Sequence, residues 1–562
     1  MKKGKIILLA ILLLASFLRF WRLGEMPALN ADEAAIGYNA YSLIQTGTDE
    51  HGNPWPIHFQ SFNDYKPGLY FYLVLPFVKI LGLNVLAVRI PGAFLGVLTV
   101  LVVYLLVREL DGYGLRVTGL KDKTRNALTH NGITALTAAF FLAISPWHIH
   151  FSRGGWEVNV ATFLITTGFW LFIKAFGKDF SVWYLVFSIL FFTASLYTYH
   201  AARIVVPLLV IGLLVIYRKD FKKNLNKIAM AAIVGVLILI PLGLDFAKGA
   251  VFSRVAGVGL FADPGPIARI NEQRGEHGDF RSTPAVLLHN KPVNYTLAFL
   301  DNWLEHFSGE FLFLSGDDIQ RNKVPETGQM YLLDILFLIA GLIAIFKSHK
   351  RWKPILLWLI VAPTAAALTF QSPHALRAHN MIIPLVVISA FGLVNLVSWL
   401  KRNIKSKRLL VVGYWLLVIL VSWQFMRYQH MYWVHLAKEY PYSSQYGVKE
   451  LVEYVDQVQD RYEKIIVTDR YDQPYILFLF YQKFPPNKFQ PEHILTPRDE
   501  FGFSTVRTFD IFRFQKIDFE QTRVDFSNSL IAGTDEEIPD EANIVKEIYG
   551  QNGHLYFQVV AN

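Results

Sequence analysis

The sequence predicts a polytopic α-helical membrane protein that ends in a small α/β domain. Apolar runs long enough to cross a bilayer recur along most of the chain. The 562 residues are 53% hydrophobic and 18% charged, with a mean hydropathy of +0.31. Soluble proteins carry roughly 25% charged residues. After about residue 430 the spanning runs stop, and shorter helical and β-rich patterns follow.

We attribute the net charge of +9 to the orientation of the chain in the membrane rather than to a nucleic-acid partner. Lys and Arg cluster in short loops between the apolar runs, as the positive-inside rule describes for cytoplasmic loops. The chain contains no cysteine, which excludes disulfides, thiolate nucleophiles and cysteine-based metal sites.

About eleven helices are expected to span the bilayer. The first is an uncleaved helix, because Arg19 and Arg22 follow the apolar run in place of a small-residue cleavage site. The expected spans are 5–21, 87–107, 132–149, 157–176, 181–198, 201–217, 228–246, 329–347, 353–370, 379–400 and 409–427.

The apolar run 67–83 is expected not to span. Basic clusters mark the N-terminus, 108–125, 218–227, 347–353 and 401–408 as cytoplasmic. Three apolar runs separate the first two clusters, so one of them cannot cross. Pro67, Pro76 and Lys79 make 67–83 the weakest span. We expect an amphipathic or re-entrant juxtamembrane helix within a first outer loop, 22–86.

This topology divides the chain into a transmembrane region, 1–430, and an exoplasmic α/β domain, 431–562. We expect the protein in the plasma membrane, with its N-terminus in the cytoplasm. A second long outer loop covers 247–328, where DNWLEHFSGEFLFLSGDD predicts a short surface helix and a turn. Loops of this length are usually functional or disordered, and its aromatics argue against full disorder.

Two adjacent carboxylates, Asp32 and Glu33, lie just beyond the first span in NADEAAIGYNAYSL. One interpretation is a solvated acidic pair at the start of a surface helix, since Asn30 is a good N-cap. The other is a general base that removes a proton from an acceptor hydroxyl as it attacks a sugar carbon. Both interpretations hold together if one residue caps and the other reacts.

Several outer-face residues are candidates for binding a charged substrate. Lys66 either anchors an interfacial helix by snorkelling or stabilises charge on a departing phosphate. Glu157 opens an apolar helix, where an acid is favourable in itself; it could instead orient an acceptor or share a divalent ion with Asp32. The nearby residues that complete this group are Asp64 and Arg153.

Two later segments carry cations suited to phosphate. YTYHAAR contains His200 and Arg203, and a guanidinium matches phosphate oxygens in a fork. SPHALRAHN contains His374, Arg377 and His379, and a helix starting after Pro373 would point free N–H groups outward. The simpler interpretation of each is an ordinary helix end with belt residues.

A metal site is not predicted. His148, His150 and Glu157 are the best candidates for metal ligands, but i, i+2 spacing does not place two histidines on one helix face. No cofactor is expected to be required, although the carboxylates are compatible with a divalent cation.

RFWRLGEMPALNADEAAIGYNAYSL, followed by NDYKPGLYFYL and FSRGGWE, resembles the GT-C membrane glycosyltransferases. Within these, it resembles the protein O-mannosyltransferase and aminoarabinose transferase group (glycosyltransferase families 39 and 83). The motifs cover about the first 220 residues. The chain has Tyr65-Lys66-Pro67-Gly68 where aminoarabinose enzymes carry Glu-Lys-Pro-Pro, and Glu157 where the mannosyltransferases commonly have Asp.

The resemblance implies an inverting enzyme that moves a sugar from a polyprenyl-phosphate donor to an exoplasmic protein, glycan or lipid, with Asp32 as the base. The expected partners are this donor, the acceptor and membrane lipids. The competing functions are a lipid or sugar transporter or flippase without covalent chemistry, and a non-catalytic scaffold. A transporter predicts charges at mid-helix depth and repeated halves, which the sequence does not display.

Overall fold

The computed structural model describes residues 2–62, 64–117, 130–177, 180–247, 257–347, 352–441, 443, 445–498 and 504–562. Parts of two predicted basic loops, 118–129 and 348–351, lie outside these residues. The chain forms two compact units. We call residues 1–19, 94–152 and 157–429 the helical unit, and residues 20–93, 153–156 and 430–562 the loop–sheet unit.

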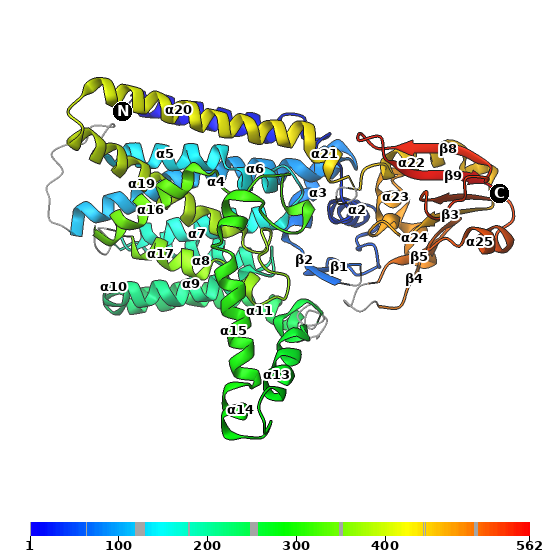
Figure 1. The fold of residues 1–562 in the computed structure, drawn as a ribbon, viewed down its shortest axis with the longest axis horizontal. Helices are drawn as coiled ribbons and strands as arrows, with labels where there is room; N and C mark the ends of the chain where they lie inside the picture. The colour runs from blue at the N-terminus through cyan, green and yellow to red at the C-terminus, as the bar shows by residue number, and fades with distance from the viewer. Residues whose placement is uncertain are drawn as a thin grey trace. The chain divides into compact units, whose positions relative to one another are not determined.

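The helical unit contains a helix at every predicted span (Figure 1). Its main apolar helices are α1 (Lys2–Phe20), α4 (Val85–Val117), α5 (His130–Ile144), α7 (Glu157–Ala175), α8 (Val182–Leu196), α9 (Ala202–Ile216), α11 (Leu225–Phe246), α16 (Leu333–Lys347), α17 (Lys353–Val361), α19 (Ile382–Asn403) and α20 (Lys407–His430). Its shorter elements are α6 (Pro146–Ser152), α10 (Arg218–Lys223), η2 (Leu260–Ala262), α13 (Gly265–Gly275), α14 (Thr283–Leu288), α15 (Lys291–Glu305), η3 (Glu310–Leu314), η4 (Gln320–Asn322), α18 (Thr364–Ala367) and η5 (His379–Met381).

Among the described residues, five helices are long and apolar enough to cross a membrane, or six if a bent pair counts as one span. The bent pair is α5 and α6, which turn by 58° at Ser145 and Pro146; the sequence predicted one continuous span there. Proline explains the break, because it removes a backbone donor and clashes with the preceding turn. Further apolar helices are shorter, including α8, α9 and α16. The chain is an integral membrane protein.

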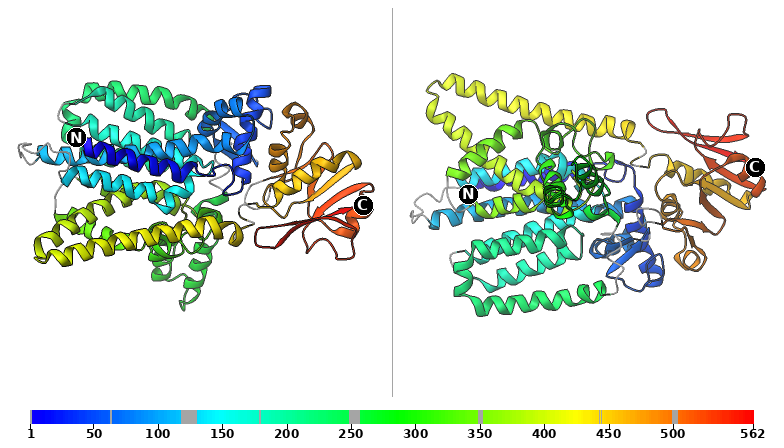
Figure 2. Two further views of the ribbon diagram at one scale, coloured as in Figure 1. Left: turned by 90° about the horizontal axis from the view of Figure 1, so that it is seen from above. Right: turned by 60° about the horizontal axis from the view of Figure 1, so that its bottom comes forward.

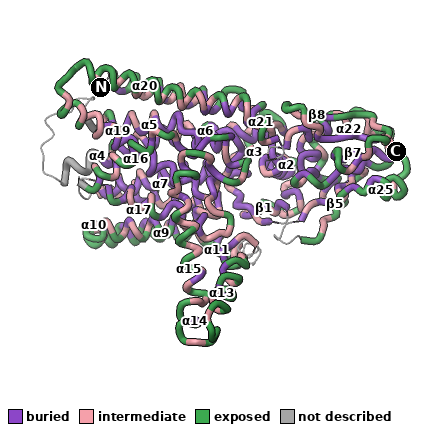
Figure 3. The backbone as a smooth tube through the Cα atoms, viewed as in Figure 1, coloured by how far each residue is buried: buried purple, intermediate pink, exposed green. Residues whose placement is uncertain are grey.

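Burial separates an inner from an outer set of helices in this unit. α7 and α19 are mostly buried, whereas α11 and α20 expose most of their apolar side chains (Figure 3). Gly341 of α16 and Gly392 of α19 let two inner backbones touch, because a Cβ on Gly392 would lie 1.8 Å from the Phe337 carbonyl oxygen. Small residues serve this purpose in membrane helix pairs. The exposed apolar faces of α11 and α20 are therefore suited to contact lipid.

The segment 247–328 is more helical than predicted. The expected surface helix in DNWLEHFSGEFLFLSGDD belongs to α15, which already begins at Lys291. Its start is determined by Asn290, whose side chain accepts a hydrogen bond from the Val293 N–H, and by a proline at the second helical position. A π-helical turn, η3, follows, and α13 and α14 precede it.

The loop–sheet unit contains the first predicted outer loop. Its elements there are α2 (Ala31–Thr46), β1 (His58–Ser61), β2 (Asp64–Pro67) and α3 (Leu69–Leu81). β1 and β2 form an antiparallel hairpin, and α3 packs against α2. The predicted juxtamembrane helix is α3; it is 13 residues long and contains Pro76. This helix is shorter than the roughly 20 residues that a span requires.

The rest of this unit is the predicted α/β fold. Its seven-stranded sheet has the order β4-β5-β6-β3-β7-β9-β8, and β3 runs parallel to β6 and β7. Ile466, Ile531 and Val560 belong to one buried cluster of this sheet. The elements are η6 (Met431–His435), α21 (Leu436–Glu439), α22 (Val448–Val458), η8 (Gln459–Arg461), β3 (Lys464–Thr468), α23 (Pro474–Tyr481), α24 (Pro486–Glu492), β4 (Ile494–Leu495), β5 (Val506–Phe509), β6 (Phe512–Gln515), α25 (Phe519–Asp525), β7 (Ser529–Gly533), β8 (Ile544–Tyr549) and β9 (Leu555–Ala561).

Candidate active site

The start of α2 is held by a capping box. The Asn30 side chain accepts a hydrogen bond from the Glu33 N–H at 3.0 Å, and the Glu33 carboxylate accepts one from the Asn30 N–H at 3.3 Å. Such reciprocal bonds satisfy backbone donors that the first helical turn leaves open. Of the adjacent acids, Glu33 is therefore the capping residue, and Asp32 is left on a different side of the helix.

Glu33 also forms a buried ion pair with Arg89 of α4. Arg89 Nε and Nη2 donate to the two carboxylate oxygens at 2.6 Å each, and neither side chain is exposed. The Gly155 N–H donates to Glu33 Oε1 at 2.7 Å. Arg89 additionally donates to the carbonyl oxygens of Leu23, Pro27 and Ala28. Glu33, which the sequence offered as a catalytic residue, thus links α2, α4 and the 153–156 segment.

Asp32 presents a different environment, because its side chain is 26% exposed. Lys66 Nζ donates to Asp32 Oδ1, and the Lys66 side chain is only 9% exposed. Lys66 lies in β2 opposite Phe59, and its ammonium stands 4.6 Å from the centre of the Phe62 ring. The hairpin thus holds a positive charge against the accessible carboxylate. A carboxylate held in this way has its oxygens positioned before any substrate arrives.

Asp64 and Arg153 are the other predicted site residues of the loop–sheet unit. Asp64 is buried at the start of β2 and accepts a hydrogen bond from the Tyr65 N–H at 2.8 Å. Arg153 is fully buried; it donates to Tyr432 Oη and to the Trp21 carbonyl oxygen, and lies 4.7 Å from the Trp433 ring. These contacts make Arg153 a bridge between the 20–26 segment and η6.

Glu50 is a feature of this unit that the sequence did not single out. It is fully buried next to Asp49, and its Oε1 lies 3.7 Å from His51 Nε2. His51 Nδ1 is 3.1 Å from His493 Nε2. Burial, and then the Asp49 charge, raise the pKa of Glu50 to about 8, although Asn39 and the Lys66 ammonium oppose this. Burial lowers the pKa of His51 to about 3.

Glu50 predicts a pH-dependent stability. A carboxyl group that titrates near 8 when folded and near 4.5 when unfolded keeps its proton in the folded state, so stability falls as pH rises through this window. Between about pH 7.5 and 9, well above the ordinary pKa of His51, thermal unfolding of the wild type should shift downward, and Glu50→Gln should flatten the profile. Parallel profiles for the two proteins would contradict the assignment of a protonated Glu50.

The helical unit holds the remaining predicted site residues. Glu157 is the first residue of α7. His200 Nδ1 lies 2.9 Å from Arg203 Nη1, and the Arg203 guanidinium covers the Phe246 ring at 4.8 Å. Arg377 Nη1 donates to Thr369 Oγ1 at 2.6 Å.

Arg203 and Arg377 stand toward the same end of this bundle. Gly212 of α9 packs against Leu357 of α17, and the later helix α18 also packs on α9. α18 must therefore lie toward the beginning of α9, where Arg203 is placed. Thr369 follows α18 directly and holds Arg377.

The expected helix start after Pro373 is wrong. Residues 375–378 form a turn, and α19 begins only at Ile382. The backbone N–H groups that were expected to be free are used: His374 N–H donates to His306 Nε2 at 3.1 Å, and Ala375 N–H to Asp317 Oδ2 at 2.6 Å. Asp317 is buried, and its pKa is raised by that burial against these hydrogen bonds. Arg377 thus lies in a turn, and the backbone before it is held by His306 and Asp317.

The histidines considered as metal ligands are engaged elsewhere. His148 Nδ1 accepts from Arg19 Nη2 at 2.7 Å, and His150 Nε2 donates to the Arg321 carbonyl oxygen at 2.9 Å. His379 pairs with Thr162 Oγ1 at 2.9 Å. Among the residues that the structure describes, no three His, Asp or Glu side chains gather as a metal-binding group.

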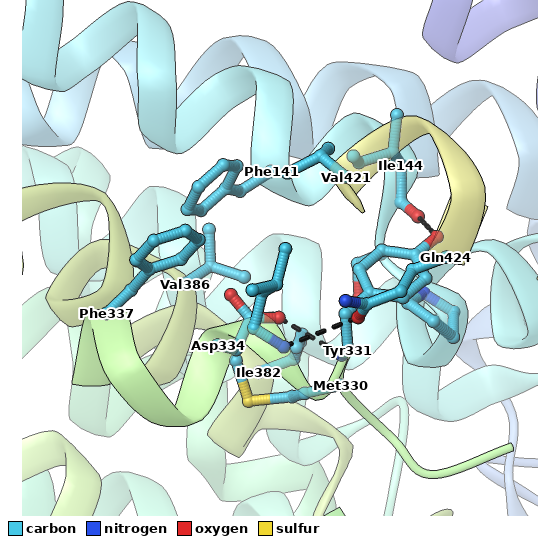
Figure 4. Close-up of a pocket in the computed structure, with 13 residues that line it drawn as sticks. Phe141, Ile144, Met330, Tyr331, Asp334, Phe337, Ile382, Val386, Val421 and Gln424 are labelled. Atoms are coloured by element: carbon cyan, nitrogen blue, oxygen red, sulfur yellow. Dashed lines mark hydrogen bonds between the residues drawn. The ribbon is translucent and has the colours of Figure 1, made fainter. Parts of the chain in front are cut away.

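A small pocket lies within the helical unit, lined mainly by residues of α5, α16, α19 and α20 (Figure 4). Tyr331 Oη donates to the Ile144 carbonyl oxygen, and the Tyr331 N–H donates to Asp334 Oδ2. Asp334 is the only charged residue in its lining. This lining offers no cation to a phosphate, whereas the Asp32–Lys66 pair places an ammonium beside a partly exposed carboxylate.

The fold is shared with solved structures of ArnT and of an archaeal oligosaccharyltransferase. ArnT from Cupriavidus metallidurans, in a crystal structure bound to undecaprenyl phosphate, superposes with a TM-score of 0.53 at 10% identity. The match covers 99% of this chain and 97% of ArnT. The apo oligosaccharyltransferase of Archaeoglobus fulgidus superposes with a TM-score of 0.51 at 13% identity, over 94% of this chain and 69% of that protein.

A third similar structure is the oligosaccharyltransferase AglB from Archaeoglobus fulgidus in complex with an inhibitory peptide and a dolichol-phosphate. This chain spans 63% of the length of AglB, with 15% identity and a TM-score of 0.49. No protein-family model and no curated protein sequence matches this chain.

Proposed function

We propose that this protein is an inverting glycosyltransferase that moves a sugar from a polyprenyl-phosphate donor to an acceptor on the exoplasmic side. The observation that carries the proposal is the partly exposed Asp32 carboxylate, paired with Lys66, in a chain with the GT-C fold. That ArnT binds undecaprenyl phosphate supports a donor of this class.

In the proposed reaction, Asp32 takes the proton of an acceptor hydroxyl or amine while the acceptor atom attacks the anomeric carbon. The bond between this carbon and the phosphate oxygen breaks, and its electron pair stays on the phosphate. Asp32 later returns its proton to water. The phosphate needs no proton to leave if cations stabilise its growing charge, so one base and a cationic clamp are enough.

Lys66 is the first cation of the proposed clamp, because its ammonium is already held beside the base. His200, Arg203, His374 and Arg377 belong to the helical unit, and their assignment to donor contacts stays a prediction from the sequence. Glu157 is assigned to acceptor orientation. Asp64 and Arg153 hold their surroundings in place through the contacts described above.

The proposed location is the plasma membrane, with the N-terminus in the cytoplasm and the α/β domain outside. Three lysines near the N-terminus and the basic residues of α10, between α9 and α11, support this orientation through the positive-inside rule.

The test is cleavage of the donor. The protein, reconstituted in liposomes, is given undecaprenyl-phosphate sugars that carry different hexoses or pentoses, together with a mixture of glycan and peptide acceptors. We expect release of free undecaprenyl phosphate and of glycosylated acceptor of inverted configuration. Movement of an intact donor between leaflets, with no cleavage, would instead establish a flippase and overturn the proposal.

A further inference from the structure

The segment 260–305 forms an arm on the helical unit. It consists of η2, α13, α14 and α15, with α13 packed on α15 (Figure 1). Arg274 Nε donates to the His289 carbonyl oxygen at 2.7 Å, and His289 Nδ1 lies 3.0 Å from Gln273 Oε1. The rings of Phe261 and Tyr295 are 5.0 Å apart. These contacts close the arm into one helical hairpin.

The base of the arm is fastened to α17 and α18. Asn302 Nδ2 donates to the carbonyl oxygens of Ala367 and Thr369, and Trp303 Nε1 to that of Ile360 at 3.0 Å. The arm points sideways, at a steep angle to α8, α9 and α11 of the same unit (Figures 1 and 2). If those helices cross a bilayer, the arm runs along the membrane plane.

One face of the arm is apolar and exposed. Leu297, Leu300 and Leu304 follow one another at i, i+3 and i+7 on α15, and Leu287 and Leu288 project from α14. These five side chains are 46–64% exposed. Exposed apolar side chains that cluster in this way on one element often mark a surface that binds a membrane or a partner. The charged residues Arg269 and Glu272 pair with each other on α13, where both are exposed.

We infer that the arm lies in the interfacial layer of the bilayer, with the Leu287, Leu288, Leu297, Leu300 and Leu304 face against the lipid chains. α11, which precedes the arm in the chain, likewise exposes apolar side chains, among them Leu237, Ile240 and Leu244. Trp303 and Phe261 supply aromatic rings, which favour the headgroup region. An amphipathic helix with these features lies in the plane of the interface.

The experiment uses the absence of cysteine from the chain. Single cysteines at Leu287, Leu297 or Leu304 report on the apolar face, and single cysteines at Arg269 or Glu272 are matched controls on exposed polar positions. Each variant carries an NBD label in nanodiscs of phosphatidylcholine and phosphatidylglycerol. Quenching is measured with spin-labelled lipids and with aqueous iodide.

We expect the three apolar-face labels to emit at shorter wavelength, to be quenched severalfold more by spin-labelled lipid, and to be protected from iodide, whereas the two controls behave in the opposite way. Equal iodide access at all five positions would overturn the inference. Protection from iodide without quenching by lipid would also overturn it, because a second copy or another protein would then cover this face.

Discussion

Replacing Asp32 by asparagine is expected to lower sugar transfer by about 10²- to 10⁴-fold, the usual contribution of a general base. An amide cannot accept the acceptor's proton, yet it has nearly the size of the carboxylate and can still receive a hydrogen bond from Lys66. The measurement is the initial rate of undecaprenyl phosphate release, with donor and acceptor saturating. Because Asp32 is partly exposed, the fold should tolerate the change.

Glu25→Gln is the matched control for this variant. Glu25 is an acid of the same first loop, but it is exposed and pairs with Arg22 at the surface. It should transfer sugar at the wild-type rate. If Asp32→Asn retained wild-type rates while its thermal unfolding also matched the wild type, Asp32 would not be the base, and a non-catalytic role would replace the proposed one.

Replacing Glu33 by glutamine is expected to destabilise the fold by about 3–5 kcal/mol, because it removes one partner of a buried ion pair. Arg89 would keep its full charge with neither side chain exposed, and the Gly155 N–H would lose its carboxylate acceptor. The measurement is the midpoint of thermal or denaturant unfolding in detergent micelles. At the surface, removal of the Arg22–Glu25 pair should cost less than about 1 kcal/mol.

A paired variant, Glu33→Leu with Arg89→Met, separates charge from packing. Replacing a whole buried ion pair by apolar residues is often neutral, so this variant should recover much of the lost stability. Wild-type stability of Glu33→Gln alone would show that Arg89 does not depend on Glu33. Loss of transfer from Glu33→Gln at temperatures where it remains folded would return Glu33 to the catalytic residues.

Hydropathy predicted the helical framework well, because a spanning helix must satisfy its own backbone and be apolar along its length. Hydropathy alone missed the 58° bend at Pro146, since apolar side chains continue on both sides of it, although the proline itself signals a break. In α15 the apolar positions follow helical periodicity, but polar residues between them hid the start of the helix at Lys291.

Less of the candidate site than of the fold could be predicted from the sequence. The pairing of Asp32 with Lys66 follows from a hairpin register that single-chain patterns do not specify. The good N-cap residue Asn30 predicted that an adjacent acid would cap the helix. The partner of Glu33, Arg89, could not be predicted because it is distant in sequence. Glu50 lies in TDEHGNP, which has the composition of an exposed turn, and only the tertiary structure buries it. The turn at 375–378 depends on Asp317 and His306, which are also distant.

A structure of the protein in lipid nanodiscs with undecaprenyl phosphate bound tests the central claim most directly. We predict that Lys66 Nζ contacts a phosphate oxygen and that Asp32 faces the side of the phosphate on which the sugar would be attached. A phosphate bound away from Lys66, with Asp32 still directed into solvent, would contradict the assignment of this pair as the site of sugar transfer.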